Sequence, residues 1–475
     1  MVFSSIAFIF YFLPLFFLLY YLAGPRYKSW VIVAGSMLFY AWSAPRFLFV
    51  ILATTLVDFY AVRAMAGTQV AGRRRAWLML SVSVNLGLLC YFKYAGFFVS
   101  NVNAVLEKAG MQPLQWLQVA LPVGISFYTF ETITYVVDVY RGMHGPLRRF
   151  RDYLLYIIFF PKLIAGPIVQ FHDFAAQIPE HTRRDTYDAR LRGLYRFILG
   201  LAKKVLIANA LAAVADDIFS TNGYHRLDTL SAWAGALSYT FQIYFDFSGY
   251  SDMALGLAQM MGFRLPENFN NPYTAVSVTD FWRRWHITLG AWMRNYLYIP
   301  LGGNRTGSGV RTLFNLWIVF VASGLWHGAA WAFVLWGIYH GCFMVAERLF
   351  LGRWLQRAGR WSVLYTFLIV SVGWVLFRIE YVRPSLEYMK AMFSWRPWNN
   401  VWMMDGEFLP VIFTAAFFSF ITLTGVGRVW QQKVFFDAYT RKMHLAMFGL
   451  SVVLLVLCAA RITSGGFNPF IYFRF

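Results

Sequence analysis

Charged residues are scarce in this chain of 475 residues. Asp, Glu, Lys and Arg make up 13% of it, hydrophobic residues make up 59%, and the mean hydropathy is +0.51. A soluble domain typically contains about 25% charged and about 45–50% apolar residues. The scarcity of charge excludes a soluble globular domain, and the long apolar runs predict an all-α polytopic membrane protein. We expect about 10–12 transmembrane helices together with re-entrant or interfacial helices.

Acidic residues are especially few: 22 Asp and Glu stand against 42 Lys and Arg, which gives a formal net charge of +20. The basic residues form short clusters between apolar runs, the clearest being residues 73–75, 141–151, 183–184 and 203–204. This pattern predicts cytoplasmic loops that face anionic lipid headgroups, not a nucleic-acid-binding surface. Because no Lys or Arg precedes the first apolar run while Arg26 and Lys28 follow it, we expect the N-terminus to face outward.

Cysteine is nearly absent. Cys90, Cys342 and Cys458 lie in apolar surroundings without CxxC or metal-ligand spacing, so the sequence predicts neither a metal site nor a disulfide. The chain also lacks a linker and a low-complexity tract. We therefore interpret residues 1–475 as a single membrane domain, with a less regular central region at residues 240–345 that we expect to carry the chemistry.

One apolar run in this region contains no Asp, Glu, Lys or Arg over residues 312–346, yet it contains His327. As a straight helix its 35 residues would measure roughly 52 Å, more than one membrane crossing and less than two. Gly324 and Gly328 flank the histidine, where a bend or re-entrant turn is easiest. A titratable group at such a place predicts a functional site. A neutral imidazole bonded to a carbonyl of a neighbouring helix is the structural alternative.

A second feature is a polar stripe in residues 241–253. On a helix, Gln242, Asp246 and Tyr250 share one face, and Ser251 and Asp252 open a second polar edge. Such stripes usually line a protein interior or a water-filled cavity, so we expect substrate or donor binding there. A hydrogen-bonded seam between helices is the alternative.

Residues 267–273 (ENFNNPY) are predicted to be a structured loop, because Pro272 cannot continue a helix. The following segment, residues 281–305, mixes tryptophans with basic residues and suits the membrane surface or a polar cavity. Its arginines, Arg283, Arg284 and Arg294, could bind the phosphates of a nucleotide-bearing donor or, equally, lipid headgroups. His286 in the same segment is a second candidate functional histidine.

Four segments in this order resemble the membrane-bound O-acyltransferase family: FDFSGYSDMA, ENFNNPY, FWRRWHITLGAWMRNYLYIPLGGNR and SGLWHGAAWAFVLWGIYHG. The resemblance runs from residue 1 to about residue 395. Within the family, the sequence is most similar to the bacterial branch typified by the alginate O-acetylation membrane subunit. The resemblance implies a helical bundle around a central tunnel, and acyl transfer from a thioester to a hydroxyl. It also implies that His327, in LWHG, is catalytic and that His286, in WRRWHIT, is the second polar position.

The chemistry of the residues agrees with that resemblance. A neutral His327 suits a general base on the acceptor hydroxyl, and His286 suits hydrogen bonding to the developing oxyanion or orienting a substrate. We expect Trp326 and Trp331 to help wall the site. No GxSxG motif is present and the cysteines lack a nearby base, so direct transfer is favoured over a covalent intermediate.

The resemblance further implies a setting. It implies acetyl-CoA or another acyl thioester as donor substrate, no bound cofactor, and a place in the bacterial inner membrane with a periplasmic N-terminus. Besides membrane lipids, the implied partners are periplasmic acetyltransferase proteins and the machinery of polysaccharide synthesis and export. Residues 467–475 are predicted to be an exposed aromatic tail that contacts such a partner, and a terminal membrane anchor is an equally good alternative. Nucleic acid is not expected as a partner.

The acceptor stays open at this point: we favour alginate, then cellulose or another exopolysaccharide, while peptidoglycan and teichoic acid are also possible. A different class of function is a transporter or flippase for a glycolipid or polysaccharide precursor, because buried histidines, Asp246 and Glu131 in broken helices also suit ion coupling. The sequence shows no inverted repeat to support it.

Overall fold

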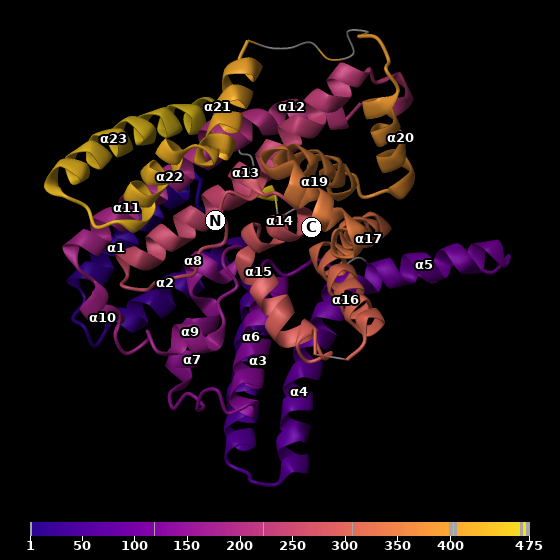
Figure 1. Cartoon of the computed structure of the whole chain (residues 1–475). Coiled ribbons are helices and arrows are strands. Elements are labelled where there is room, and N and C mark those ends of the chain that lie inside the picture. The colour runs from indigo at the N-terminus through magenta and orange to yellow at the C-terminus, as the bar shows by residue number, and fades with distance from the viewer. Residues whose placement is uncertain are drawn as a thin grey trace. The chain divides into compact units, whose positions relative to one another are not determined.

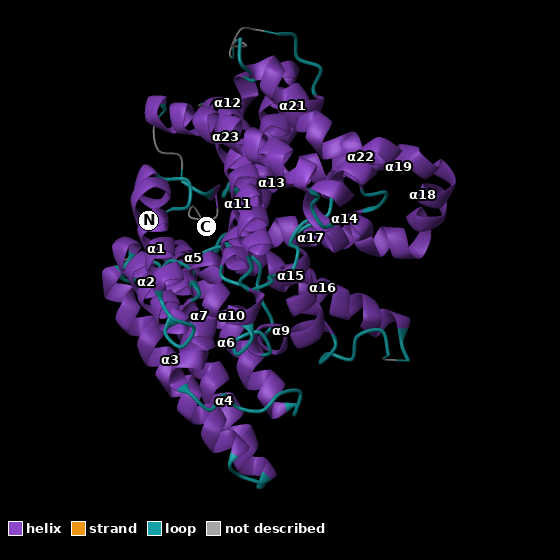
Figure 2. Ribbon diagram, turned by 90° about the vertical axis from the view of Figure 1, so that its left-hand side faces the viewer, coloured by secondary structure: helices purple, strands orange, loops and turns teal. Residues whose placement is uncertain are grey.

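The computed structural model describes residues 2–117, 119–221, 223–305, 307–398, 402, 406–465 and 469–471. Within these ranges the chain forms helices joined by loops and turns, and contains no strand (Figure 2). The prediction of an all-α membrane protein is therefore confirmed. The chain divides into two compact units, which are residues 1–193 with 257–266, and residues 194–256 with 267–475.

The first unit contains the helices of the N-terminal part of the chain (Figure 1). They are η1 (Ala7–Phe12), α1 (Leu13–Leu22), α2 (Lys28–Ser43), α3 (Pro45–Ala66), α4 (Ala71–Leu89), η2 (Cys90–Tyr94), α5 (Ala95–Lys108), α6 (Ile125–Tyr140), α7 (Phe150–Ile158), α8 (Phe160–Leu163), α9 (Phe171–Ala175), α10 (His181–Arg184) and the start of α11 (Tyr187–Ala202).

Helices α3, α4 and α6 pack together in this unit around a buried polar group. The carboxylate of Asp58 on α3 accepts hydrogen bonds from Ser81 Oγ (2.5 Å) and Asn85 Nδ2 (3.0 Å) on α4. A second buried group lies on α6, where Glu131 forms an ion pair with Lys162 of α8. Buried charges in proteins are stable only when they are paired or hydrogen-bonded, as both of these are.

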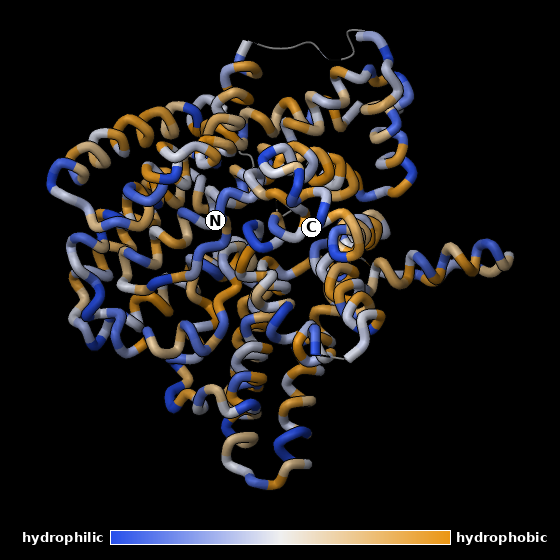
Figure 3. The backbone as a smooth tube through the Cα atoms, in the orientation of Figure 1, coloured by the Kyte–Doolittle hydropathy of each residue, from blue (hydrophilic) through white to orange (hydrophobic). Residues whose placement is uncertain are grey.

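Basic residues from two of the predicted cytoplasmic clusters contact helix ends in the first unit. Arg74, at the start of α4, donates a hydrogen bond to the carbonyl oxygen of Tyr140 at the end of α6 (2.9 Å). Arg151 lies 5.5 Å from the ring centre of Trp30, near the start of α2. Figure 3 shows the hydrophilic residues at the start of α4. The first contact brings the start of α4 beside the end of α6, and the second brings the start of α7 beside the start of α2.

The second unit contains the remaining helices. They are the rest of α11, η3 (Lys203–Ala208), α12 (Asn209–Phe219), η4 (Tyr224–Arg226), α13 (Thr229–Met260, whose last turn lies in the first unit), η5 (Pro272–Thr274), α14 (Val278–Arg284), α15 (Ile287–Trp292), η6 (Met293–Tyr298), α16 (Gly309–His327), α17 (Trp331–Ala346), η7 (Glu347–Leu351), α18 (Gly352–Ala358), η8 (Gly359–Trp361), α19 (Ser362–Arg378), α20 (Val382–Phe393), α21 (Phe408–Phe420), η9 (Ile421–Leu423), α22 (Gly425–Gln431), η10 (Gln432–Phe436) and α23 (Arg441–Ser464).

Helices α16 and α17 form a tightly packed antiparallel hairpin because glycines lie at their crossing. A Cβ atom on Gly324 would lie 2.3 Å from the carbonyl oxygen of Phe333, and one on Gly337 would lie 2.3 Å from that of Phe320. No side chain fits in either place. The glycines therefore let the two backbones approach closely, as small residues do between membrane helices.

Six helical stretches in the described residues are long and apolar enough to cross a membrane, or seven if the bent pair at residues 408–436 counts as one span. They cover residues 45–66, 71–108, 187–219, 309–327, 331–378 and 441–464. The sequence predicted 10–12 spans from its apolar runs. One further apolar helix among the described residues, Ala7–Leu22, is shorter than a full membrane crossing.

One predicted loop is wrong. Lys203 and Lys204 were expected in a cytoplasmic loop, but they lie in η3 within the helical stretch 187–219. Lys203 pairs with Asp252 (2.6 Å), and Lys204 pairs with Asp246 (2.5 Å). Both carboxylates lie on α13, so the lysines join two helices, a role that sequence proximity alone does not reveal.

Candidate active site

His327 is the last residue of α16, and the helix ends there because Gly328 adopts an extended conformation. A Cβ atom on Gly328 would lie 2.0 Å from the ring of Phe333, so only glycine fits this break. The bend predicted around Gly324 and Gly328 is thereby confirmed. The His327 side chain is 3% exposed and packs edge-on against Trp336 and Phe377, at 5.2 and 5.1 Å between ring centres.

His286 lies in the short break between α14 and α15, where its backbone is left-handed (φ 45°, ψ 53°). It is the residue before the first turn of α15 and is 1% exposed. Its ring contacts Phe247 of α13 at 4.7 Å and Trp326 of α16 at 6.0 Å. A left-handed conformation is strained for a residue other than glycine, and such strain tends to persist at functional sites.

Trp326 brings the two candidate histidines into one aromatic cluster. Its ring centre lies 4.9 Å from that of His327 and 6.0 Å from that of His286. Trp326 is buried, as expected of a side chain that walls the site. Trp331, the other tryptophan expected to wall the site, is 57% exposed. Trp336, one helical turn further along α17, packs on His327 instead.

The loop at residues 267–273 holds His286 through Asn268. Asn268 Oδ1 lies 3.0 Å from His286 Nδ1 and accepts hydrogen bonds from the backbone N (3.3 Å) and Oγ1 (2.9 Å) of Thr288. Asn268 Nδ2 donates to Ser251 Oγ on α13 (3.3 Å). The loop was predicted from Pro272, but neither Asn268 nor Thr288 was singled out. The only signal in the sequence was that Asn and Thr side chains can each donate and accept hydrogen bonds.

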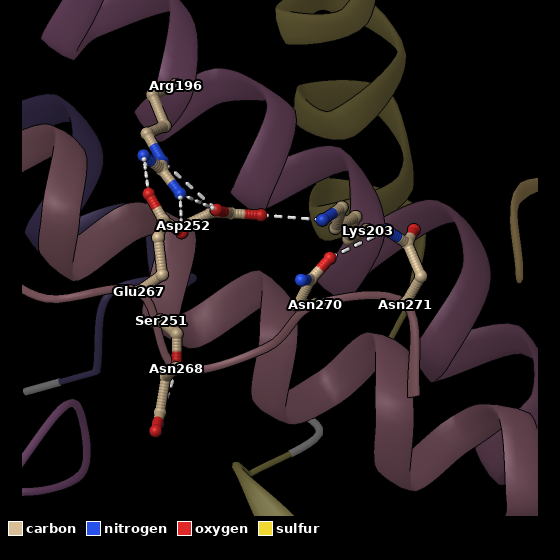
Figure 4. Close-up of polar contacts among 8 residues, drawn as sticks. All are labelled: Arg196, Lys203, Ser251, Asp252, Glu267, Asn268, Asn270 and Asn271. Atoms are coloured by element: carbon tan, nitrogen blue, oxygen red, sulfur yellow. Dashed lines mark hydrogen bonds and ion pairs between the residues drawn. The ribbon is translucent and has the colours of Figure 1, made fainter. Parts of the chain in front are cut away.

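An ion-pair cluster fixes the start of the same loop (Figure 4). Arg196 donates to both oxygens of Glu267 (2.7 and 2.6 Å) and to Asp252 Oδ1 (2.9 Å), and Lys203 pairs with the other oxygen of Asp252. Arg196 thus ties α11, α13 and the loop together. Residues 49 to 71 positions apart therefore fix the geometry next to Asn268.

The acidic side chain of Glu347 supports the other end of the segment that carries His286. It accepts hydrogen bonds from the backbone N of Val278 (2.6 Å) and Thr279 (2.9 Å), the first residues of α14. The Thr279 hydroxyl donates to it as well (2.7 Å). A carboxylate at a helix N-terminus satisfies orphan N–H groups and interacts favourably with the helix dipole. Sequence reasoning did not identify this residue.

The polar stripe predicted on α13 forms a helix face, as expected. Asp246 pairs with Lys204 and accepts a hydrogen bond from the backbone N of Ile471 (2.7 Å). The Tyr250 ring stacks on Phe470 at 4.6 Å. Gln242 is buried on the same helix. The structure thus places Asp246 and Tyr250 against the C-terminal segment of the chain.

The sequence predicted an exposed tail, but none of its three described residues is exposed, and Pro469 is half-buried. Phe470 is 1% exposed and Ile471 is 4% exposed. Phe470 also contacts Phe247, which in turn contacts His286. Residues 466–468 and 472–475 lie outside the described residues. Phe470 therefore packs within the second unit, because its ring finds the aromatic partners Phe247 and Tyr250 on α13.

The three arginines considered for phosphate or lipid binding differ in their exposure. Arg283 and Arg294 are exposed. Arg284 is partly buried and pairs with Asp280 one turn earlier in α14 (3.0 Å). No group of three or more His, Cys, Asp or Glu side chains suited to a metal ion occurs among the residues that the structure describes.

Burial determines the protonation state of His286, which lies outside the six candidate spans. Desolvation lowers the pKa of its imidazole to about 3. Because the charged form loses its hydration on burial, the ring is neutral near pH 7. A neutral ring can accept a hydrogen bond at one nitrogen while it donates at the other.

These features define a polytopic helical membrane protein with two buried histidines beside one tryptophan, in a region of broken helices. Residues 147–382 match the membrane-bound O-acyltransferase family. The chain is 40% identical to the probable alginate O-acetylase of Pseudomonas putida over the whole of both proteins. It is 36% identical to the peptidoglycan O-acetyltransferase of Helicobacter pylori, over 82% of this chain and 80% of that protein.

A more distant relative is the teichoic acid D-alanyltransferase of Bacillus subtilis, at 26% identity over 54% of this chain and 68% of that protein. The chain belongs to the membrane-bound O-acyltransferase family and is an O-acyltransferase. Both the resemblance inferred from its motifs and the enzyme class that it implied are confirmed.

Proposed function

We propose that the protein passes an acetyl group from a cytoplasmic thioester, acetyl-CoA or a related donor, across the bacterial inner membrane for O-acetylation of an exported polysaccharide. The observation that carries this proposal is the position of His286 and His327 against Trp326, at breaks in helices of the second unit. Acyl transfer needs a neutral base and exclusion of water, and a buried aromatic site supplies both conditions.

In this proposal His327 removes the proton of the acceptor hydroxyl while the thioester carbonyl is attacked. The C–S bond breaks as the new C–O bond forms, and the thiol leaves with a proton. His286 contacts the same tryptophan. Its proposed role is to form a hydrogen bond with the developing oxyanion or to orient a substrate. Trp326, Trp336 and Phe377 exclude water from the His327 ring.

The proposed orientation has a periplasmic N-terminus and basic loops in the cytoplasm. The contact between Arg74 and Tyr140 supports it, because it brings two predicted basic loops together and basic loops are retained on the cytoplasmic side. The partners we propose are periplasmic acetyltransferase proteins and the machinery that makes and exports the polymer. Alginate is the acceptor we favour, because relatives with this named activity match the chain over its full length. Cellulose or another exopolysaccharide is the next choice.

The test is the O-acetyl content of exported polysaccharide in cells that carry wild-type protein, His327→Ala or His286→Ala. We expect His327→Ala to abolish acetylation while polymer yield and membrane protein level stay normal. His225→Ala is the matched control, because His225 is exposed and remote in sequence from both histidines. Full acetylation with His327→Ala would refute the mechanism, and loss of polymer export itself would favour a transporter.

A further inference from the structure

The hydrogen bonds of Asn268 determine which nitrogen of His286 carries the proton. Asn268 Oδ1 faces the backbone N–H of Thr288 as well as His286 Nδ1. A backbone N–H can only donate, so the Asn268 atom that faces it is the oxygen and not the amide nitrogen. The same oxygen then accepts from His286, and Nδ1 is the protonated nitrogen of the ring.

A neutral imidazole carries one N–H, so protonation at Nδ1 leaves the lone pair on Nε2. We infer that Asn268 is a positioning residue, which holds His286 in this tautomer and thereby makes Nε2 the acceptor of a hydrogen bond or proton from the substrate. This inference rests on the proposed acyl transfer and refines it. Of the two roles considered for His286, it selects orientation of a hydroxyl or thiol over donation to an oxyanion.

Asn268 also holds the strained backbone of His286. The carbonyl oxygen of Asn268 accepts from the backbone N of Ile287 (2.9 Å), and its side chain accepts from the backbone N of Thr288. These bonds flank the left-handed residue on its C-terminal side and satisfy the first N–H groups of α15. A non-glycine residue in such a conformation costs on the order of 1–3 kcal/mol, which the surrounding structure must offset.

The position of Asn268 is itself fixed from three directions. Its Nδ2 donates to Ser251 Oγ on α13. The preceding residue, Glu267, is held by Arg196, and two residues later the backbone N of Asn270 donates to the carbonyl oxygen of Arg284 (2.9 Å) (Figure 4). A side chain held this firmly can impose one orientation on the ring that it contacts, as partners of functional histidines do.

Neutral and aromatic groups face the His286 ring from the elements packed against it. Among them are Phe247 of α13, Trp326 of α16 and the Asn268 amide of the loop. The carboxylates next in the network, Asp252 and Glu267, are paired with Arg196 and Lys203. A new negative charge at position 268 would therefore act directly on His286.

Asn268→Asp tests this inference because the carboxylate still accepts the Nδ1 proton but favours the charged ring. The pKa of His286 rises, so the inactive imidazolium forms at higher pH than in the wild type. The measurement is acetyl transfer from radiolabelled acetyl-CoA in membrane vesicles at a series of pH values. As the pH is lowered, we expect the Asn268→Asp variant to lose activity at a higher pH than the wild type. At alkaline pH the variant should retain much of the wild-type rate. Asn268→Ala should lower the rate by about 10- to 100-fold.

Asn270→Ala is the matched control, since Asn270 is exposed in the same loop and its side chain contacts Asn271. It should leave both the rate and the pH profile unchanged. If Asn268→Asp and Asn268→Ala lowered the rate by the same factor at every pH, Asn268 would have only a structural role and the inference would be overturned.

A second measurement does not depend on the proposed function. Nitrogen-15 solid-state NMR of histidine-labelled protein in lipid reports the tautomer, and His286→Gln identifies the signal. We expect the wild-type ring to be protonated at Nδ1. A ring protonated at Nε2 would overturn the inference, whereas vesicles without acetyl transfer but with the Nδ1 tautomer would refute the proposed function alone.

Discussion

At the scale of single residues, buried polar side chains fix the helix breaks that carry the histidines. Glu347 accepts three hydrogen bonds at the start of α14, and Asn268 accepts three more at the start of α15. Glu347 adds to a local cap of α14, where the Ser277 hydroxyl accepts from the backbone N of Asp280 (3.0 Å). The start of α15 has no side-chain cap from its own N-cap residue, so Asn268 supplies the acceptor. Removing such an acceptor leaves buried N–H groups without a partner, which is costly.

Glu347→Ala is therefore expected to destabilise the folded protein by about 1–3 kcal/mol, because the N–H groups of Val278 and Thr279 lose their acceptor. Glu347→Gln should be milder, since its amide oxygen still accepts. Thermal unfolding of the purified protein, followed by tryptophan fluorescence, measures the effect. Glu380→Ala is the control, as Glu380 is exposed. Equal stability of Glu347→Ala and the control would contradict the capping role.

At the scale of elements, the antiparallel crossing of α16 and α17 determines where His327 lies. Gly324→Val should separate the two helices, because its Cβ atom would lie 2.3 Å from the carbonyl oxygen of Phe333. We expect low levels of folded protein and loss of acetylation. Gly449→Ala, also within a helix, has nothing within 4 Å of the added Cβ atom and should be tolerated. Membrane protein level and size-exclusion profile distinguish the two variants.

Ion pairs join η3 to α13. Lys204 and Asp246 form a buried pair, so Asp246→Ala leaves a buried cation without its partner and should cost about 3–5 kcal/mol. Glu387→Ala breaks the exposed pair with Arg383 and should cost about 0–1 kcal/mol. Urea unfolding of both variants in detergent compares them. If Asp246→Ala lowered the free energy of unfolding by no more than Glu387→Ala does, water or another group would be compensating the charge of Lys204.

At the scale of the whole molecule, the proposed orientation predicts which loops face the cytoplasm. In protein whose three native cysteines are replaced, Gln69→Cys and Met143→Cys should react with a membrane-impermeant maleimide only from the cytoplasmic side. Both positions are exposed and lie beside the basic clusters. Gln112→Cys, beyond the stretch 71–108, should react from the periplasmic side. Labelling of positions 69 and 143 from opposite sides would refute the orientation.

Much of the fold and part of the site could be predicted from neighbouring residues. The polar face of α13 follows from the spacing of Asp246 and Tyr250, and the end of α16 follows from glycines beside His327. By contrast, Lys203 and Lys204 resemble an exposed basic cluster until α13 supplies their carboxylates. Trp331 and Trp336 are equally good candidates to cover His327 until packing buries only the second.

The sequence by itself determined the helical membrane class, the family and the two candidate histidines, because hydrophobicity, helix periodicity and short motifs are properties of adjacent residues. Tertiary structure alone decided that Asn268 orients His286, that Glu347 caps α14, and that Ile471 donates to Asp246. These contacts join residues 18, 69 and 225 positions apart. Whether a polar side chain finds such a distant partner depends on how the helices pack, and no local pattern encodes that.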